Sequence, residues 1–411
     1  LDQLLTVSGP KIMLSQILIL GLSLISTVFC GHLGRTELAG VSLATAVINV
    51  TGISVGRGLA AACDTLVSQT FGSNNLLGVG VVLQRAILIL LLACFPCWAI
   101  LINTEPILLA VKQEPAVARL AQLYVKIFMP ALPAAFIYTL LTRYLQNQGI
   151  IWPQVITGVV VNILNALINY IFLYQLNLGV AGSAASNALS QFCMAGLLYA
   201  HILWKGLHKA TWGGWSKECL QDWSSYIQLA IPSMIMICAK WWMYEIGCFL
   251  AGLINQVELG AQSVVYQMAT ITYMFPLGFC IAGTVKVGSA LGAGDTEQAK
   301  LSAKLSVFCA VSVSVCLSIA IGSLKDHVSY AAMGGVIRGA GKQKVGAICN
   351  IVGYYGIGFP IGVSLMFAAK LGIKGLWTGL FTCVFLQCTF LFFYLTRLNW
   401  KTVKYEVSLQ I

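Results

Sequence analysis

The chain has 411 residues, of which 58% are hydrophobic and only 9% are charged, and its formal net charge at pH 7 is +11. This composition excludes a soluble globular domain and indicates a polytopic membrane protein. The lysines and arginines are scattered at the ends of apolar segments, so the positive charge is no nucleic-acid footprint. The 14 cysteines lie mainly in apolar segments, where they act as small hydrophobic residues rather than as a disulfide framework.

Eleven apolar segments are long enough to cross a bilayer as helices, since about 20 residues span its hydrocarbon core. Gly and Pro interrupt them, which favours helices over barrel strands. Leu1 to Ser8 is too short for a cleavable signal, so we expect none. Val328 to Ile337 forms a further apolar stub of only about ten residues, or ~15 Å of helix. The eleven segments are centred at residues 11–30, 38–62, 77–103, 120–145, 151–176, 179–204, 225–254, 259–285, 301–324, 344–369 and 375–396.

A basic, tryptophan-rich linker, residues 208–224, follows the sixth apolar segment. Such a linker is typical of the cytoplasmic membrane face. Two later basic clusters lie around Arg338 and Arg397. In a frame of twelve spans both face the cytoplasm, whereas in a frame of eleven spans both would face outward. Their charge therefore indicates that one span has been lost between the ninth and tenth segments. The positive-inside rule therefore favours an ancestor of twelve spans with its N-terminus in the cytoplasm.

The second half of the sequence repeats the first half. Early matches lie 222 and 220 positions apart, whereas later matches lie only 189 and 188 positions apart. The second half is therefore about 31 residues shorter, which is close to one membrane crossing. The matched pairs are Pro10 and Pro232, Gly72 and Gly292, Gln154 and Gln343, and Asn162 and Asn350.

These observations predict an all-α polytopic membrane protein with two pseudo-symmetric six-helix bundles. The bundles comprise residues 1–207 and 225–411, and the cytoplasmic linker at 208–224 joins them. The second bundle lacks about one helix near residues 328–337, which leaves eleven full spans and the stub. A cleft between two such parallel repeats is the usual plan of an alternating-access transporter. A channel is the weaker alternative, because no selectivity-filter loop is visible.

Two ionisable residues, Lys240 and Glu245, lie near the middle of the seventh segment. An ionisable residue inside a membrane is costly and is a functional candidate by default, with a packing salt bridge or snorkelling as the alternative. Their spacing of five residues puts them about 140° apart around a helix, so we expect no direct pair. Asp64, at the end of the second segment, is expected to be a cap or a gate contact rather than a proton site.

Aromatic residues surround this position in the seventh and eighth segments and predict a site for flat or cationic organic solutes. Ordinary aromatic packing is the alternative. Gln16 and Asn49 are polar candidates for the same site from the first half, where most such residues form hydrogen bonds between helices. The aromatic candidates are Trp241, Trp242, Tyr244, Tyr266 and Tyr273.

No constellation of a hydrolase, a kinase or a metalloenzyme is present, so we expect neither an enzyme nor a metal site. Gly56-Arg57-Gly58 has glycine spacing but no strand and helix around it to bind a dinucleotide. Cys94 and Cys97 have redox spacing but lie in an apolar segment. We therefore expect no cofactor.

Several segments resemble the vertebrate multidrug and toxin extrusion (MATE) transporters, which are organic cation/proton antiporters. The resemblance covers nearly the whole chain. It implies a twelve-helix core, alternating access, and proton-driven export of cationic drugs and metabolites across the plasma membrane. The partners it implies are organic cations, protons and the lipid bilayer, and no nucleic acid. The segments are Val28–Gly34, Ala62–Gln69, Leu145–Gly149, Thr211–Ser216, Trp241–Trp242 and Leu291–Asp295.

The chain departs from the family pattern at its membrane carboxylates. The family's tandem-Trp helix normally begins with Glu, and this chain has Lys240 there; Gln267 replaces the Glu of the next helix. A further family Glu belongs to the missing helix, so Glu245 alone remains. The departures predict a MATE scaffold whose proton coupling is weakened or lost.

Three other interpretations remain open. A truncated chain with weak or no transport could associate with a full-length relative or interfere with it. A flippase for lipids or oligosaccharides, from the wider superfamily, is a weaker candidate because the motifs are those of drug transporters. A junction in the gene model near Ala332 and Met333 would also produce the deficit.

Overall fold

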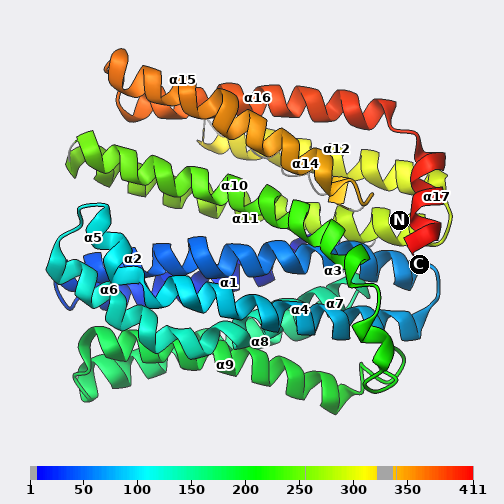
Figure 1. The fold of residues 1–411 in the computed structure, drawn as a ribbon, viewed down its shortest axis with the longest axis horizontal. Helices are drawn as coiled ribbons and strands as arrows, with labels where there is room; N and C mark the ends of the chain where they lie inside the picture. The colour runs from blue at the N-terminus through cyan, green and yellow to red at the C-terminus, as the bar shows by residue number, and fades with distance from the viewer. Residues whose placement is uncertain (1–6, 255, 322–336, 339, 411) are drawn as a thin grey trace.

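The computed structural model describes residues 7–254, 256–321, 337–338 and 340–410, and the regular structure in them is entirely helical. Long helices run side by side along the molecule (Figure 1). The first half, residues 7–205, contains α1 (Gly9–Gly31), α2 (Arg35–Ile48), α3 (Ser54–Gly72), α4 (Leu76–Ile102), α5 (Thr104–Ala110), α6 (Pro115–Phe128), α7 (Leu132–Asn147), α8 (Trp152–Tyr170) and α9 (Gly179–Lys205). The second half, residues 223–410, contains α10 (Trp223–Ile254), α11 (Gln256–Gly292), α12 (Thr296–Ile321), α14 (Gln343–Asn350), α15 (Phe359–Val363), α16 (Ile373–Arg397) and α17 (Trp400–Gln410).

Ten helical segments of the described chain are long and apolar enough to cross a membrane, so the protein is a multi-pass membrane protein. They correspond in order to ten of the eleven predicted spans. The remaining prediction, at 179–204, falls on α9, which has 27 residues but is not among the ten. The predicted stub lies outside the described residues except for Ile337. The ten segments are 9–31, 35–72, 76–102, 115–147, 152–175, 223–251, 265–292, 296–317, 343–368 and 373–397.

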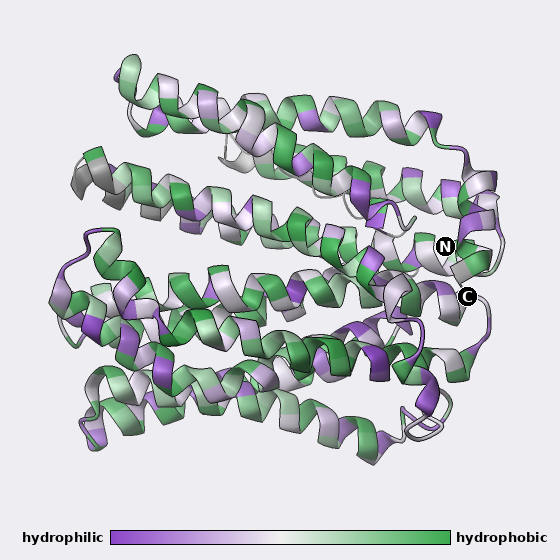
Figure 2. Ribbon diagram, viewed as in Figure 1, coloured by the Kyte–Doolittle hydropathy of each residue, from purple (hydrophilic) through white to green (hydrophobic). Residues whose placement is uncertain are grey.

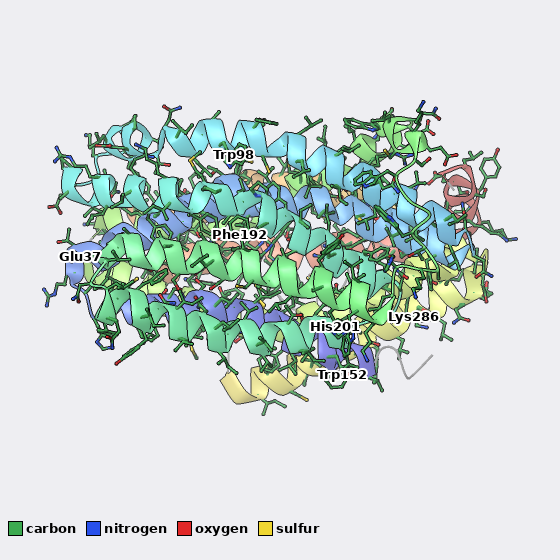
Figure 3. The ribbon with its side chains drawn as sticks, turned by 90° about the horizontal axis from the view of Figure 1, so that it is seen from below. Glu37, Trp98, Trp152, Phe192, His201 and Lys286 are labelled. Atoms are coloured by element: carbon green, nitrogen blue, oxygen red, sulfur yellow. The ribbon has the colours of Figure 1, made fainter. Side chains whose placement is uncertain are left out.

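The outer surface of the helices is apolar, as lipid contact requires. Large hydrophobic side chains such as Ile163 and Phe393 are more than half exposed. Hydrophilic residues gather in the connections at the two ends of the molecule (Figure 2). Glu37 lies near one end and Lys286 lies toward the other, with the aromatic ring of Phe192 between them (Figure 3). This distribution agrees with helices that cross the bilayer end to end.

The second predicted span was too short at its C-terminal end. Its helix does not stop near residue 62, because α2, a short π-helical turn at Asn49–Ile53 and α3 form one continuous segment to Gly72. Nearly every residue from Gly58 to Thr70 is buried. The polar residues of this stretch bind other protein groups instead of facing lipid, so they do not end the span. Asp64 therefore lies inside α3 and does not cap it.

The buried apolar residues form one large cluster in the first half and smaller ones in the second. The large cluster extends from Leu22 to Ala230 and includes the start of α10. In the second half, one cluster joins α10 to α16 around Tyr244 and Leu376. Another joins α11, α12 and α17 around Val287. The division into two pseudo-symmetric bundles at residues 207 and 225 remains a prediction.

The two halves approach each other closely where α3 crosses α11. A Cβ atom added to Gly72 would lie 2.0 Å from the carbonyl oxygen of Ser289, and one added to Gly292 would lie 1.9 Å from that of Gln69. Only glycine permits backbones to approach this closely. The contact is reciprocal, because the two glycines are a matched pair of the sequence repeat. It lies at the end of the molecule that carries both termini and α17 (Figure 1).

Candidate functional site

A cleft lies between the two halves, about 15 residues or ~22 Å along α3 from the Gly72 crossing. It encloses about 800 Å³, counting the part that opens to solvent. The cavity that remains without the open part is about 110 Å³, which is smaller than the usual site for a drug-sized molecule. The lining residues come from α1, α3, α7, α10, α11 and α14, and from Arg338 just before α14: Gln16, Arg57, Arg143, Met236, Ile237, Lys240, Trp241, Tyr273, Leu277, Ile281, Arg338 and Asn350.

Four cationic side chains line the cleft, and none of its described lining residues is acidic. Arg143 has a counter-ion next to the cleft, since its Nη1 lies 3.0 Å from Oδ2 of Asp64. Asn147 donates a hydrogen bond to the other oxygen of Asp64 at 3.2 Å. In the described part of the chain, Arg57, Lys240 and Arg338 form no ion pair. The described lining of the cleft therefore carries an excess of positive charge.

Lys240 lies against an aromatic wall formed by Trp241 and Tyr273. Its Nζ atom is 3.6 Å from the centroid of the Tyr273 ring, which is a cation–π contact. The rings of Trp241 and Tyr273 meet edge to face with centroids 6.4 Å apart. Lys240 and Glu245 form no ion pair, as their spacing around α10 predicts.

Arg338 is held between α3 and α11 although it is only 8% exposed. Its Nη2 donates to Sγ of Cys280 at 3.1 Å, and its backbone carbonyl accepts a hydrogen bond from the Thr65 hydroxyl at 2.9 Å. The Nε atom of Arg338 is buried and has no hydrogen-bond partner among the residues that the structure describes. A buried guanidinium with a free donor is suited to bind an anionic group that enters the cleft.

Glu245 belongs to a second cluster that does not line the cleft. Its Oε1 atom accepts a hydrogen bond from the Tyr266 hydroxyl at 3.5 Å. The ring of Tyr244 packs against Tyr266, with centroids 5.9 Å apart, and against Trp377, with centroids 6.3 Å apart. The hydroxyl that binds this partly buried carboxylate thus belongs to a group of aromatic rings in the second half.

The structure separates the residues that the sequence predicts for one site. Gln16, Trp241 and Tyr273 line the cleft, together with Lys240. Tyr244 and Tyr266 lie beside Glu245. Trp242, Asn49 and Gln267 lie in neither place. The Trp242 indole donates to the Val50 carbonyl at 3.0 Å, and the Asn49 carbonyl accepts from the Ser54 hydroxyl at 2.6 Å. Gln267 is exposed.

The sequence reasoning missed the four other polar or charged lining residues: Arg57, Arg143, Arg338 and Asn350. For Arg143 and Arg338 the only sequence signal was positive charge at segment ends, which the positive-inside rule assigns to a membrane face. Arg57 was considered only as part of a nucleotide motif. Arg57 lies inside the predicted segment 38–62, and a charge inside a span is a functional signal that was available in the sequence.

Comparison with known proteins places this arrangement in a family. The sequence model of the MatE family matches residues 12–171 and 232–330, which is more than half of the chain. The chain belongs to the multidrug and toxin extrusion family. Multidrug and toxin extrusion protein 1 of Danio rerio is 62% identical over 437 residues, covering 99% of this chain and 74% of the relative. The Homo sapiens protein of the same name is 53% identical over 430 residues, covering 98% and 75%.

Solved MATE structures share the fold. The crystal structure of the eukaryotic MATE transporter AtDTX14 superposes with a TM-score of 0.93 at 25% identity, covering 99% of this chain and 98% of that one. A MATE structure in a bent conformation gives a TM-score of 0.83 at 15% identity, covering 99% and 97%. The match to the Danio rerio relative runs over 437 residues, 26 more than this chain has. The alignment is therefore longer than this chain, so residues of that relative have no counterpart here.

Proposed function

We propose that this MATE chain extrudes organic solutes across the plasma membrane by alternating access of its cleft, with proton exchange at Glu245. The observation that carries the proposal is the polar and aromatic cleft between two halves that meet backbone to backbone at one end. Such a cleft can open to one side while the glycine crossing of α3 and α11 closes the other. Rocking of the two halves about this crossing would move the opening to the opposite side.

Glu245 is the residue that we propose for coupling. It is a partly buried carboxylate in a span, and exchange of a proton for a solute requires such a group. The Tyr266 hydroxyl stabilises its charged form, so loss or gain of a proton changes the hydrogen bonding in the cluster. The family resemblance makes organic cations the first solutes to test, and the Trp241 and Tyr273 rings offer stacking surfaces in the cleft.

The test is uptake of a fluorescent organic solute into proteoliposomes that contain the purified chain, with and without a pH gradient. Glu245→Gln should reduce gradient-driven uptake by about tenfold or more, because a single exchangeable carboxylate is removed. Glu297→Gln is the matched control, since Glu297 is an exposed carboxylate paired with Lys300 on the surface. Equal stimulation by the pH gradient in the wild type and in Glu245→Gln would refute proton exchange at Glu245.

A second candidate function is association with a full-length relative. The observation in its favour is the shortfall of residues against the Danio rerio protein. On this proposal the chain alone transports nothing, and its co-expression changes the transport rate of the relative. Uptake measured with the chain alone, the relative alone and both together separates the two functions. Transport by the purified chain alone would refute the second.

A further inference from the structure

We propose that an anionic phospholipid binds on the outside of the first half, at the end of α9. Its phosphate contacts Lys205 and Lys209, its glycerol backbone lies against Trp204, and its acyl chains follow α8 and α9. None of the described residues that line the cleft comes from α8 or α9. The site is therefore separate from the cleft, and the inference does not rest on the proposed function.

The first argument is the apolar face that α8 and α9 present to the membrane. The two helices pack side by side at the edge of the molecule (Figure 1). Phe192 lies midway along this face (Figure 3). In a bilayer, acyl chains cover such a surface, so a ligand at its end shares the face with lipid and is itself a lipid. Six large side chains of the face are between 47% and 65% exposed: Ile156, Ile163, Leu167, Phe192, Tyr199 and Leu203.

The second argument is a pair of exposed tryptophans at the end of this face. Trp204, in the last turn of α9, is 77% exposed, and Trp152, in the first turn of α8, is 56% exposed. The ring of His201 meets the Trp204 indole edge to face, and His201 and Trp152 lie toward the same end of the molecule (Figure 3). Indole rings prefer the boundary between acyl chains and headgroups. The ends of both helices therefore lie at the level of the headgroups.

The third argument is the position of two lysines beside the Trp204 indole. The Nζ atom of Lys205 lies 4.5 Å from the centroid of the Trp204 ring. The Nζ atom of Lys209 lies 3.5 Å from the place of a Cβ on Gly206, so its side chain returns to the end of α9. Within the described part of the chain, Lys205 and Lys209 form no ion pair. Both ammonium groups can therefore bind the phosphate of a lipid whose chains lie along the helices.

These lysines favour an anionic headgroup over a zwitterionic one. A choline headgroup would bring its own positive charge toward Lys205 and Lys209, which repel it. The headgroup of phosphatidylserine has a net negative charge, and each lysine near a membrane surface strengthens attraction to such lipids. Anionic lipids are enriched in the cytoplasmic leaflet. This agrees with the sequence, which predicts that the end of α9 and the linker after it face the cytoplasm.

The experiment is native mass spectrometry of the purified chain, titrated in detergent with phosphatidylserine or phosphatidylcholine of the same acyl chains. We expect the wild type to bind phosphatidylserine about tenfold more tightly. The double variant Lys205→Ala/Lys209→Ala should lower phosphatidylserine binding about tenfold and leave phosphatidylcholine binding unchanged. Trp204→Ala should weaken the binding of both lipids, because the indole contacts the part that they share.

The matched control is Lys401→Ala/Lys404→Ala, which removes the same charge from two exposed lysines of α17 at the end that carries both termini (Figure 1). It should leave phosphatidylserine binding unchanged. Equal losses in the two double variants would overturn the inference, since net charge alone would then attract the lipid.

Two results with the wild type would overturn the inference without any variant. Equal binding of the two lipids would show that the tryptophans only anchor the chain in the membrane. Displacement of phosphatidylserine by an equal concentration of soluble glycerophosphoserine would show that the lysines bind a free phosphate ester and not a lipid.

Discussion

The two halves use equivalent asparagines in the same way. In the first half, Nδ2 of Asn162 on α8 donates to the Leu18 carbonyl on α1 at 2.8 Å. In the second half, Nδ2 of Asn350 on α14 donates to the Met236 carbonyl on α10 at 2.5 Å. Each bond ties a later helix to the first long helix of its own half. The repeat thus retains an interaction that holds a half together.

The equivalent glutamines differ. Gln154 binds within the first half, donating to the Thr142 carbonyl at 3.2 Å and accepting from the Gln146 amide at 2.8 Å. Gln343 instead donates across the halves to the Thr65 hydroxyl at 2.6 Å. Thr65 in turn donates to the Arg338 carbonyl. The difference shows that the second half uses this position to bind the other half, whereas the first half uses it internally.

Among the variants that test this comparison, replacement of the glycines at the α3–α11 crossing should have the largest effect, and the effect should be on stability. Gly292→Ala should lose about 3 kcal/mol or more of stability, since its Cβ would overlap a backbone oxygen that cannot move aside alone. Gly72→Ala should cost a similar amount if the crossing is reciprocal. Gly196→Ala on α9, where nothing lies within 4 Å of the new Cβ, is the control. Monodisperse elution of Gly292→Ala in size-exclusion chromatography would contradict the close approach.

Loss of the equivalent asparagines should have an intermediate and equal effect. Asn162→Ala and Asn350→Ala each remove a hydrogen bond between helices, which is worth about 1 kcal/mol in membrane proteins. Thermal unfolding of the two variants in the same detergent measures both losses. A large loss in one variant and none in the other would show that only one half depends on this bond.

The glutamine variants should have the smallest effect, which should appear as a change in how often the protein opens at the Arg338 end. Gln343→Leu removes the bond to Thr65 and should favour opening at the Arg338 end by about fivefold, as expected for one hydrogen bond of ~1 kcal/mol. Gln154→Leu should leave the opening unchanged. The readout is the rate at which Cys280, buried beneath Arg338, reacts with a thiol reagent, followed by mass spectrometry. Equal rates in both variants would refute a role for Gln343 between the halves.

Much of the fold could be predicted from the sequence because hydropathy reports the cost of placing each residue in lipid. Ten predicted spans correspond to helices long enough to cross. The end of α3 was misplaced for the same reason. Hydropathy treats Asp64, Ser68 and Gln69 as exposed to lipid, whereas the structure buries them against other helices.

The sequence by itself determined a helical membrane protein, its family, its internal repeat and the shortfall of the second half. It also identified Lys240, Trp241 and Tyr273 as site candidates, because ionisable and aromatic residues within a span stand out locally. Only the tertiary structure decided that Arg57 and Arg338 join them while Glu245 does not. Those arginines come from segments that are far apart in the chain, and their charges act together only where the helices bring them to one cleft.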